Sequence, residues 1–468
     1  ADNNTAIGFA SLKANTTGTN NVAVGCGSLS STQTTNDNTG IGFDALTVNT
    51  GSNNTALGSK AFRGNQTSND GVAVGHCALF TNTTGASNTG LGAFALKLNT
   101  TGACNVAVGS SALYSNTTAS DNTAVGHQAL FTNVTGANNV AVGKNALYYN
   151  TASTNTAIGN LAMTNTSTGA GNTAVGQNAL TANTTGTENV AIGKNALDAN
   201  TEGGYSVAVG NSALGAQTTG ANNVAVGRTA LAALTTGTRN TVVGGSYALG
   251  AGAAITTGYH NVIVGNDAAG TMTEGHNNTV VGTEALKVNT TGSANVAIGT
   301  KALCTATTSS SNVAVGRESM KLTTTGTANV AVGTKSLAAN TTGSANTSIG
   351  MQSLHVNTEG SSLTAVGYNA GCANTTGDGN TFVGREAGNG NTTADHNTAV
   401  GYFALKVATT GACNVGVGYN ALGNMTTTCC NTAIGHSTGT SVTTGIANTM
   451  IGSRAGCNVT TGDRSVFV

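Results

Sequence analysis

The chain has 468 residues and a mass of 45.5 kDa, with 67 Gly but no Pro and no Trp. Its 17 basic and 17 acidic residues cancel, so the sequence predicts no basic surface for a nucleic-acid backbone. It has no apolar run long enough for membrane insertion, and its low net charge and moderate hydrophobicity argue against a disordered chain.

One short motif recurs along the whole sequence. The pentapeptide Asn-Thr/Val-Ala-Val/Ile-Gly ends in a residue that we name the anchor glycine, and 27 anchors run from Gly8 to Gly452. Of the 26 intervals between anchors, 23 are 17 residues long. A fixed period of this size is typical of a solenoid, in which each unit packs only against its neighbours. The sequence therefore predicts an all-β, parallel β-solenoid of about 27 coils, one continuous domain over 1–468 with no separate catalytic domain.

Each coil is expected to contain two short strands joined by turns. The first is the pentapeptide, and the second begins at an Ala-Leu pair that follows the anchor. The residue before the anchor is Val, Ile or Leu in all 28 copies of the strand motif. Because side chains alternate along a strand, this slot and the Leu slot are predicted to form the core. The predicted core ladder includes Val24, Val125, Val142, Leu130 and Leu147.

An Asn precedes the first strand in 24 of the 28 copies. In stacked coils these side-chain amides would lie one above another, and each could donate a hydrogen bond to the next. The alternative is that Asn serves only as a turn former. The predicted ladder includes Asn105, Asn122 and Asn139.

Variation in repeat length locates the turns. The two 16-residue copies are one residue short in the Asn-Thr-Thr-Gly stretch, at 49–51 and 150–152, so this stretch is predicted to be a turn. The single 21-residue copy has its extra residues near 245–258, and a bulged coil is expected there.

Charged residues occupy only six slots, which lie one, two, five, nine, eleven or twelve residues after the anchor. The slot two residues before the anchor is never charged, is usually Ala, and is expected to point away from the core. Strands that are apolar on both faces are usually buried on both faces. A partner chain packed along this row is one interpretation, and a neutral exposed face is the other. The candidate interface residues are Ala124, Ala141, Phe382, Met450 and Phe467.

The unit Asn122-Thr123-Ala124-Val125-Gly126-His127-Gln128-Ala129-Leu130 resembles the head repeats of trimeric autotransporter adhesins. It is also similar to repeats in tail fibres of phages and large viruses. The resemblance implies a left-handed parallel β-roll, three chains packed side by side, and an adhesive or fibrous role. The present unit is longer by a Thr-rich turn.

Residues that carry chemistry are scattered. The seven His residues show no metal-ligand spacing, and no catalytic grouping occurs, so neither an enzyme nor a cofactor is predicted. Among nine Cys residues, Cys413 and Cys430 share one slot in successive coils. Stacked strands are about 4.8 Å apart, which is within the Cα range of a disulfide. A bridge between them is a hypothesis, with free thiols as the alternative.

The Asn-Thr-Thr turn also creates glycosylation sequons in one slot. Their Asn residues would be glycan acceptors if the chain were secreted by a eukaryotic route, although turn chemistry explains the motif equally well. The candidates are Asn15, Asn82, Asn99, Asn116 and Asn183.

These features favour an extracellular structural protein that forms a fibre with copies of itself, as a cell-surface appendage or a virion fibre. Neither end of the sequence shows a cap, which favours head-to-tail stacking, although a fragment of a longer protein would read the same way. The alternative is an adhesin or host-recognition shaft with an unknown receptor. An ice-binding solenoid is a third hypothesis, weakened because the Thr/Val slot is mixed and is expected to point to the core.

Overall fold

The computed structural model describes residues 2–245 and 250–468, and within them it contains strands and turns but no helix. The chain is a parallel β-solenoid of about 27 coils with repeats of about 17 residues, as predicted. It divides into two compact units, Ala1–Val226 and Gly227–Val468. Part of the coil that was expected to bulge, residues 246–249, lies outside the described residues.

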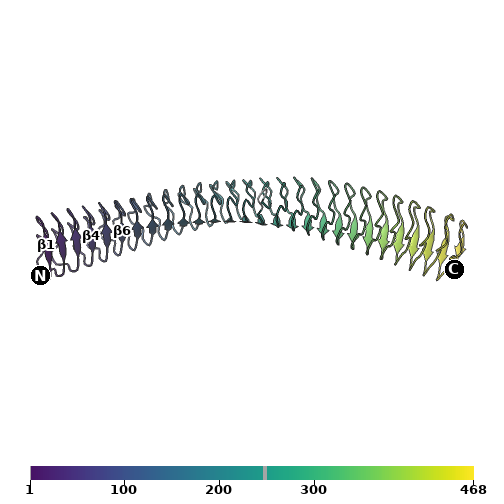
Figure 1. Ribbon diagram of the computed structural model, residues 1–468, viewed down its shortest axis with the longest axis horizontal. Helices are drawn as coiled ribbons and strands as arrows, with labels where there is room; N and C mark the ends of the chain where they lie inside the picture. Colours follow the sequence, from purple (N-terminus) through teal and green to yellow (C-terminus); the bar gives the residue numbers. More distant parts are fainter. Residues whose placement is uncertain (1, 246–249) are drawn as a thin grey trace. The chain divides into compact units, whose positions relative to one another are not determined.

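Unit 1 contains fourteen strands of three residues each, one per coil (Figure 1). Each pairs in parallel with the next; in one such pair Ala107 faces Ala124. The strands are β1 Thr5–Ile7, β2 Val22–Val24, β3 Thr39–Ile41, β4 Thr55–Leu57, β5 Val72–Val74, β6 Thr89–Leu91, β7 Val106–Val108, β8 Thr123–Val125, β9 Val140–Val142, β10 Thr156–Ile158, β11 Thr173–Val175, β12 Val190–Ile192, β13 Val207–Val209 and β14 Val224–Val226.

The described part of unit 2 repeats the arrangement with fourteen further parallel strands. In its first pair Val242 faces Ile263. The strands are β15 Thr241–Val243, β16 Val262–Val264, β17 Thr279–Val281, β18 Val296–Ile298, β19 Val313–Val315, β20 Val330–Val332, β21 Thr347–Ile349, β22 Thr364–Val366, β23 Thr381–Val383, β24 Thr398–Val400, β25 Val415–Val417, β26 Thr432–Ile434, β27 Thr449–Ile451 and β28 Val466–Phe467.

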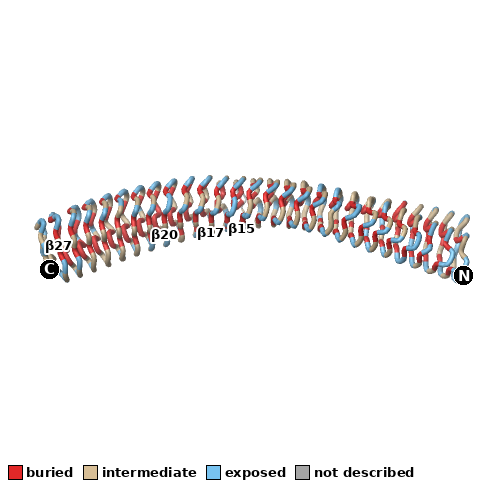
Figure 2. The backbone as a smooth tube through the Cα atoms, turned by 180° about the vertical axis from the view of Figure 1, so that it is seen from behind, coloured by how far each residue is buried: buried red, intermediate tan, exposed pale blue. Residues whose placement is uncertain are grey.

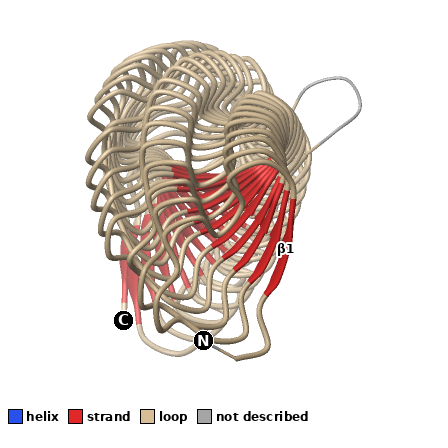
Figure 3. Ribbon diagram, turned by 90° about the vertical axis from the view of Figure 1, so that its left-hand side faces the viewer, coloured by secondary structure: helices blue, strands red, loops and turns tan. Residues whose placement is uncertain are grey.

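Among the described residues each coil has one strand, so the prediction of two was wrong. The Ala-Leu segment is a turn: Gln128 and Leu130 adopt φ angles of 56° and 51°, which no extended strand allows. The Ala129 N–H donates to the Gly126 carbonyl oxygen at 3.3 Å and closes the first part of this turn. Strands therefore occupy one side of the coil, and turns form the rest (Figure 3).

Anchor glycines are required where the strand ends. Gly126 has a φ of 138°, and a Cβ there would lie 2.6 Å from the carbonyl oxygen of Gly143 in the next coil. The Gly126 N–H donates to the Val108 carbonyl oxygen at 2.8 Å, so the backbones are in direct contact at this corner. No side chain fits between them.

The interior is formed by the middle residue of each strand and by the Leu of the facing turn. Ala124 and Leu130 are both fully buried, whereas Val125 is partly exposed on the other side of the strand. The narrow coil accommodates one small strand residue opposite one Leu, which leaves the larger Val outside. The core prediction was therefore correct for Leu130 and Leu147 and wrong for Val24, Val125 and Val142.

The same orientation overturns the predicted lateral interface. The Ala row points into its own coil, and the bulkier residues of this row are buried there too. Phe382 fits because the Leu slot holds glycine on both sides of it: a Cβ at Gly371 or Gly388 would collide with its ring. Ala124, Ala141, Phe382 and Met450 are fully buried, and Phe467 is partly exposed.

The predicted Asn ladder is confirmed. The Asn122 Nδ2 and backbone N–H donate to Asn105 Oδ1 at 3.2 and 3.0 Å. Asn139 makes the same two bonds to Asn122, at 3.1 and 3.0 Å. Each carboxamide oxygen thus accepts twice from the next coil, which satisfies a buried corner.

A second amide ladder, seven residues after each anchor, was not predicted. The Asn116 Nδ2 donates to Asn99 Oδ1 at 2.7 Å, and the Asn133 Nδ2 donates to Asn116 Oδ1 at 3.3 Å. This is the sequon slot. A glycan would be attached to an Nδ2 atom that here is buried and donates a hydrogen bond, so the glycosylation prediction is wrong for the folded chain. Asn82, Asn99, Asn116 and Asn183 are fully buried, and Asn15 is half-buried with its Nδ2 bonded to Gly18.

Candidate functional site

The first and third residues of each strand form a continuous surface in each unit, which we name the outer face. In β8 these residues are Thr123 and Val125, both partly exposed, with the buried Ala124 between them. The same alternation occurs in nearly every strand, so exposed and buried positions form parallel lines along each unit (Figure 2). Two of the residues predicted to be core, Val125 and Val142, lie side by side on this face.

The outer face is apolar and uncharged. Its third row is Val, Ile or Leu almost throughout, its first row is Thr or Val, and no charged residue occupies either row. Ile158, Ile192 and Ile434 are each 41% exposed. Branching at Cβ restricts χ1 of the Thr, Val and Ile side chains, so the face is less flexible than one of unbranched side chains. An extended apolar surface of this kind usually marks an interaction site.

A row of aromatic and cationic side chains follows the anchor glycines in unit 2. The Arg385 guanidinium lies 5.6 Å from the ring centre of Tyr368 and 5.5 Å from that of Tyr402. Further along, the rings of Tyr419 and His436 are stacked with centroids 5.0 Å apart. These contacts stabilise neighbouring coils, and they cover the ring faces, which leaves mainly ring edges for a ligand.

Unit 1 has a similar row five residues after the anchor. Tyr114, Phe131 and Tyr148 stack with centroids 5.0 Å apart, and the Lys97 ammonium lies 5.2 Å from the Tyr114 ring centre. The sequence analysis missed this row. The signal was present, because these aromatic residues are separated by one repeat period of 17 residues.

The nine cysteines are free thiols. Cys413 and Cys430 are exposed and occupy equivalent turn positions, with φ angles of 59° and 61°, but they are not bridged. Burial raises the pKa of the Cys304 and Cys372 thiols. A hydrogen bond with Cys430 raises the pKa of Cys429. A raised pKa disfavours the reactive thiolate, so these three side chains are poor nucleophiles at neutral pH.

Within the described residues, His, Cys, Asp and Glu side chains form no group of three or more that could bind a metal ion. The described part of the chain also contains no helix that is long and apolar enough to cross a membrane. The sequence was compared with models of protein families and with curated proteins, and neither comparison found a match.

Proposed function

We propose that this chain is a structural protein that assembles side by side with further copies of itself through the outer face, as the subunit of a fibre or filament. The observation that carries the proposal is the outer face: two exposed rows of Thr, Val and Ile without a charge in any strand of either unit. Leaving such a surface in water costs free energy, and covering it recovers that free energy.

A second copy suits this face because of its period. Adjacent strands are about 4.8 Å apart, so a partner must present side chains at the same spacing over many strands. Another copy of the chain has the same strand spacing because it has the same fold. Because the face is uncharged, bringing two such faces together creates no repulsion between like charges.

The area also suits a stable contact. Fourteen strands about 4.8 Å apart and about 10 Å wide give each unit an outer face of about 650 Å². A standard interface buries about 800 Å² on each partner. The number of chains in the assembly, end-to-end stacking, an extracellular location and a role as an adhesion shaft remain predictions from the sequence.

The experiment places two charges on the face. Val125→Lys with Ile158→Lys should shift the protein from oligomer to monomer in sedimentation velocity, with little change in thermal unfolding, because both side chains point outward. The matched control is His127→Lys with Asn160→Lys in the same two coils. Both control residues are exposed, in a slot where Lys144 already occurs, so self-association should be unchanged.

Two results would contradict the proposal. One is a wild-type protein that stays monomeric at tens of micromolar. The other is thermal hysteresis of the monomer that the face variant abolishes. That result would assign the outer face to ice, whose binding the exposed Thr row also permits now that this row is seen to face outward.

A further inference from the structure

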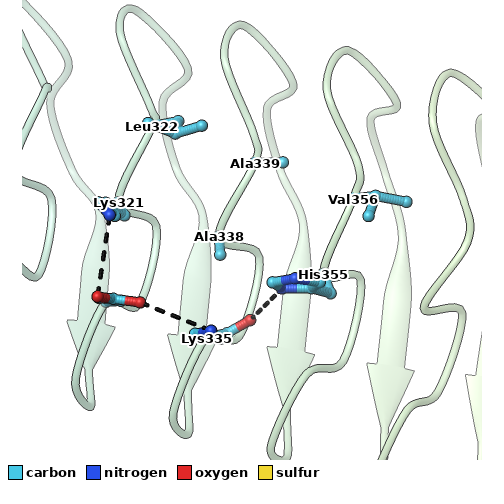
Figure 4. Close-up of a pocket in the computed structure, with 8 residues that line it drawn as sticks. Lys321, Leu322, Lys335, Ala338, Ala339, His355 and Val356 are labelled. Carbon is cyan, nitrogen blue, oxygen red and sulfur yellow. Dashed lines mark hydrogen bonds and ion pairs between the residues drawn. The ribbon is translucent and has the colours of Figure 1, made fainter.

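A small bay opens on the surface of unit 2 at Ala338 (Figure 4). Lys321, Ala338 and His355 hold the same slot, five residues after the anchor, in three successive coils. The Ala338 side chain ends at Cβ while both neighbours are long, so a cavity of about 260 Å³ remains between them. Ala338 forms its floor and is only 8% exposed.

The lower edge of this Ala338 bay carries unbalanced positive charge. The Lys321 and Lys335 Nζ atoms lie 3.8 and 4.0 Å from the two carboxylate oxygens of Glu318. One carboxylate neutralises only one of the two ammonium groups. Both distances are too long for a strong hydrogen bond, so the ammonium protons remain able to donate to another acceptor.

The opposite wall of the bay is apolar. Leu322 and Val356 flank the cavity, with exposed fractions of 45% and 37%. A hydrogen bond orients the His355 ring: its Nδ1 lies 3.3 Å from the Lys335 carbonyl oxygen, which accepts. An apolar wall beside a few polar groups that fix orientation is the usual composition of a small-molecule site.

We propose that the Ala338 bay binds a small organic carboxylate. Its carboxylate would accept hydrogen bonds from the Lys321 and Lys335 ammonium protons that Glu318 does not engage, and its apolar flank would lie against Leu322 and Val356. The cavity of about 260 Å³ has room for a molecule of about one ring, such as a sugar acid or an aromatic acid. This inference is independent of the self-association proposed above.

The chain contains a natural comparison for this site. Glu284, Lys287 and Lys301 repeat the charge arrangement 34 residues earlier, with Nζ–oxygen distances of 3.6 and 3.8 Å. There, Cys304 takes the place of Ala338. Burial, together with the Glu284 carboxylate, raises the pKa of Cys304, so at this position a neutral thiol group is added to the side chain that ends at Cβ in Ala338.

The first experiment titrates the protein with benzoate and with glucuronate, and with the neutral counterparts benzyl alcohol and glucose, by isothermal calorimetry and NMR. Saturable binding of either carboxylate is expected, at least tenfold tighter than that of its neutral counterpart and weakened by salt. The acid that binds more tightly identifies the ligand class. Equal binding of acid and neutral counterpart, or no saturation, would overturn the proposal.

Three variants then test the geometry. Ala338→Phe should abolish binding without loss of fold, because the same slot holds Phe80 and Phe131 elsewhere, while Ala232→Phe in that slot should have no effect. Lys335→Gln should weaken binding at least fivefold. Retained affinity in Ala338→Phe, or unchanged affinity in Lys335→Gln, would contradict the assigned site.

Discussion

Two regions of the chain differ inside the coil, seven residues after each anchor. In unit 1 seven successive coils, from Asn49 to Asn150, place Asn in this slot, and amide hydrogen bonds join all the neighbouring pairs except Asn65 and Asn82. In the first three coils of unit 2 the slot holds Leu234, Ile255 and Met272, all fully buried, and a shorter amide ladder returns from Asn340 to Asn391. The same coil is therefore filled either by hydrogen-bonded amides or by apolar side chains, and the fold requires volume at this slot rather than one chemistry.

Mixing the two chemistries has a cost, which Asn289 shows. It lies between Met272 and Ala306 in the row, and neither its Nδ2 nor its Oδ1 makes a hydrogen bond, although the residue is fully buried. Within the ladders of this slot an Asn bonds to the Asn of a neighbouring coil, as Asn116 does to Asn99, whereas Asn289 has no amide on either side. A buried polar group without a partner costs about 1–3 kcal/mol.

Unit 2 also departs from unit 1 in how it divides volume between strand and turn. Unit 1 pairs Ala or Gly in the strand with Leu, Phe or Met in the turn. In unit 2, Phe382 and Met450 occupy the strand slot, and glycine takes the Leu slot beside each of them. Of the seven ion pairs among the described residues, six are in unit 2. Unit 1 therefore repeats one combination of a small strand residue and a large turn residue. In unit 2, a large strand residue is accommodated by small turn residues beside it.

The largest effect is expected at Phe382. Phe382→Ala should reduce the free energy of unfolding by about 3–5 kcal/mol, because it opens a cavity bordered by two glycines. Adding Gly371→Leu and Gly388→Leu should restore most of this loss, since Leu in that slot adopts a positive φ near 50° elsewhere, as Leu130 does. Urea unfolding followed by circular dichroism measures both variants. A triple variant less stable than Phe382→Ala would show that volume is not exchanged between these slots.

Within the amide ladder of unit 1, Asn116→Leu should destabilise the protein by about 1–3 kcal/mol. Asn99 Oδ1 would lose its donor, and Asn133 Nδ2 would lose one acceptor. Hydrogen exchange should increase first in the coils of these two residues. An unchanged unfolding midpoint would mean that the ladder contributes only shape.

The same substitution in unit 2 should have the opposite sign. Asn289→Leu removes two unsatisfied polar atoms and places an apolar side chain next to Met272, so an increase in stability of about 1 kcal/mol is expected. Thermal unfolding of the Asn116→Leu and Asn289→Leu variants under one condition is the direct comparison. Shifts in the same direction would refute the distinction between the two interiors.

The smallest effect concerns a carboxylate of unit 1 that makes no ion pair with any described residue. Burial raises the pKa of Asp198, so the folded state binds a proton more readily than the unfolded state. Stability should therefore fall as pH rises through the raised pKa and stay lower above it. Asp198→Asn should raise the melting temperature slightly at pH 7 and leave it unchanged at about pH 3, below the unfolded pKa. A larger gain at low pH would reverse the assigned sign.

Much of the fold could be predicted from residue spacing. The anchor period predicted the coils, the two 16-residue repeats located the turn at 49–51, and the position of Asn122 predicted its ladder. The second ladder was missed because Asn-Thr-Thr is also a common turn sequence and a sequon. The Ala338 bay could not be predicted from the sequence, because an Ala between long side chains leaves a cavity only when the coils are stacked.

The sequence by itself determined that the chain is a solenoid, how many coils it has and which slots carry charge, because a strict period can be satisfied only by stacked, equivalent units. Only the tertiary structure decided which side of the strand is inside. Alternation shows that Thr123 and Val125 share a face, but not which face is buried. That choice depends on the width of the closed coil, where the turn brings Leu130 across from Ala124 and leaves no room for a second large side chain.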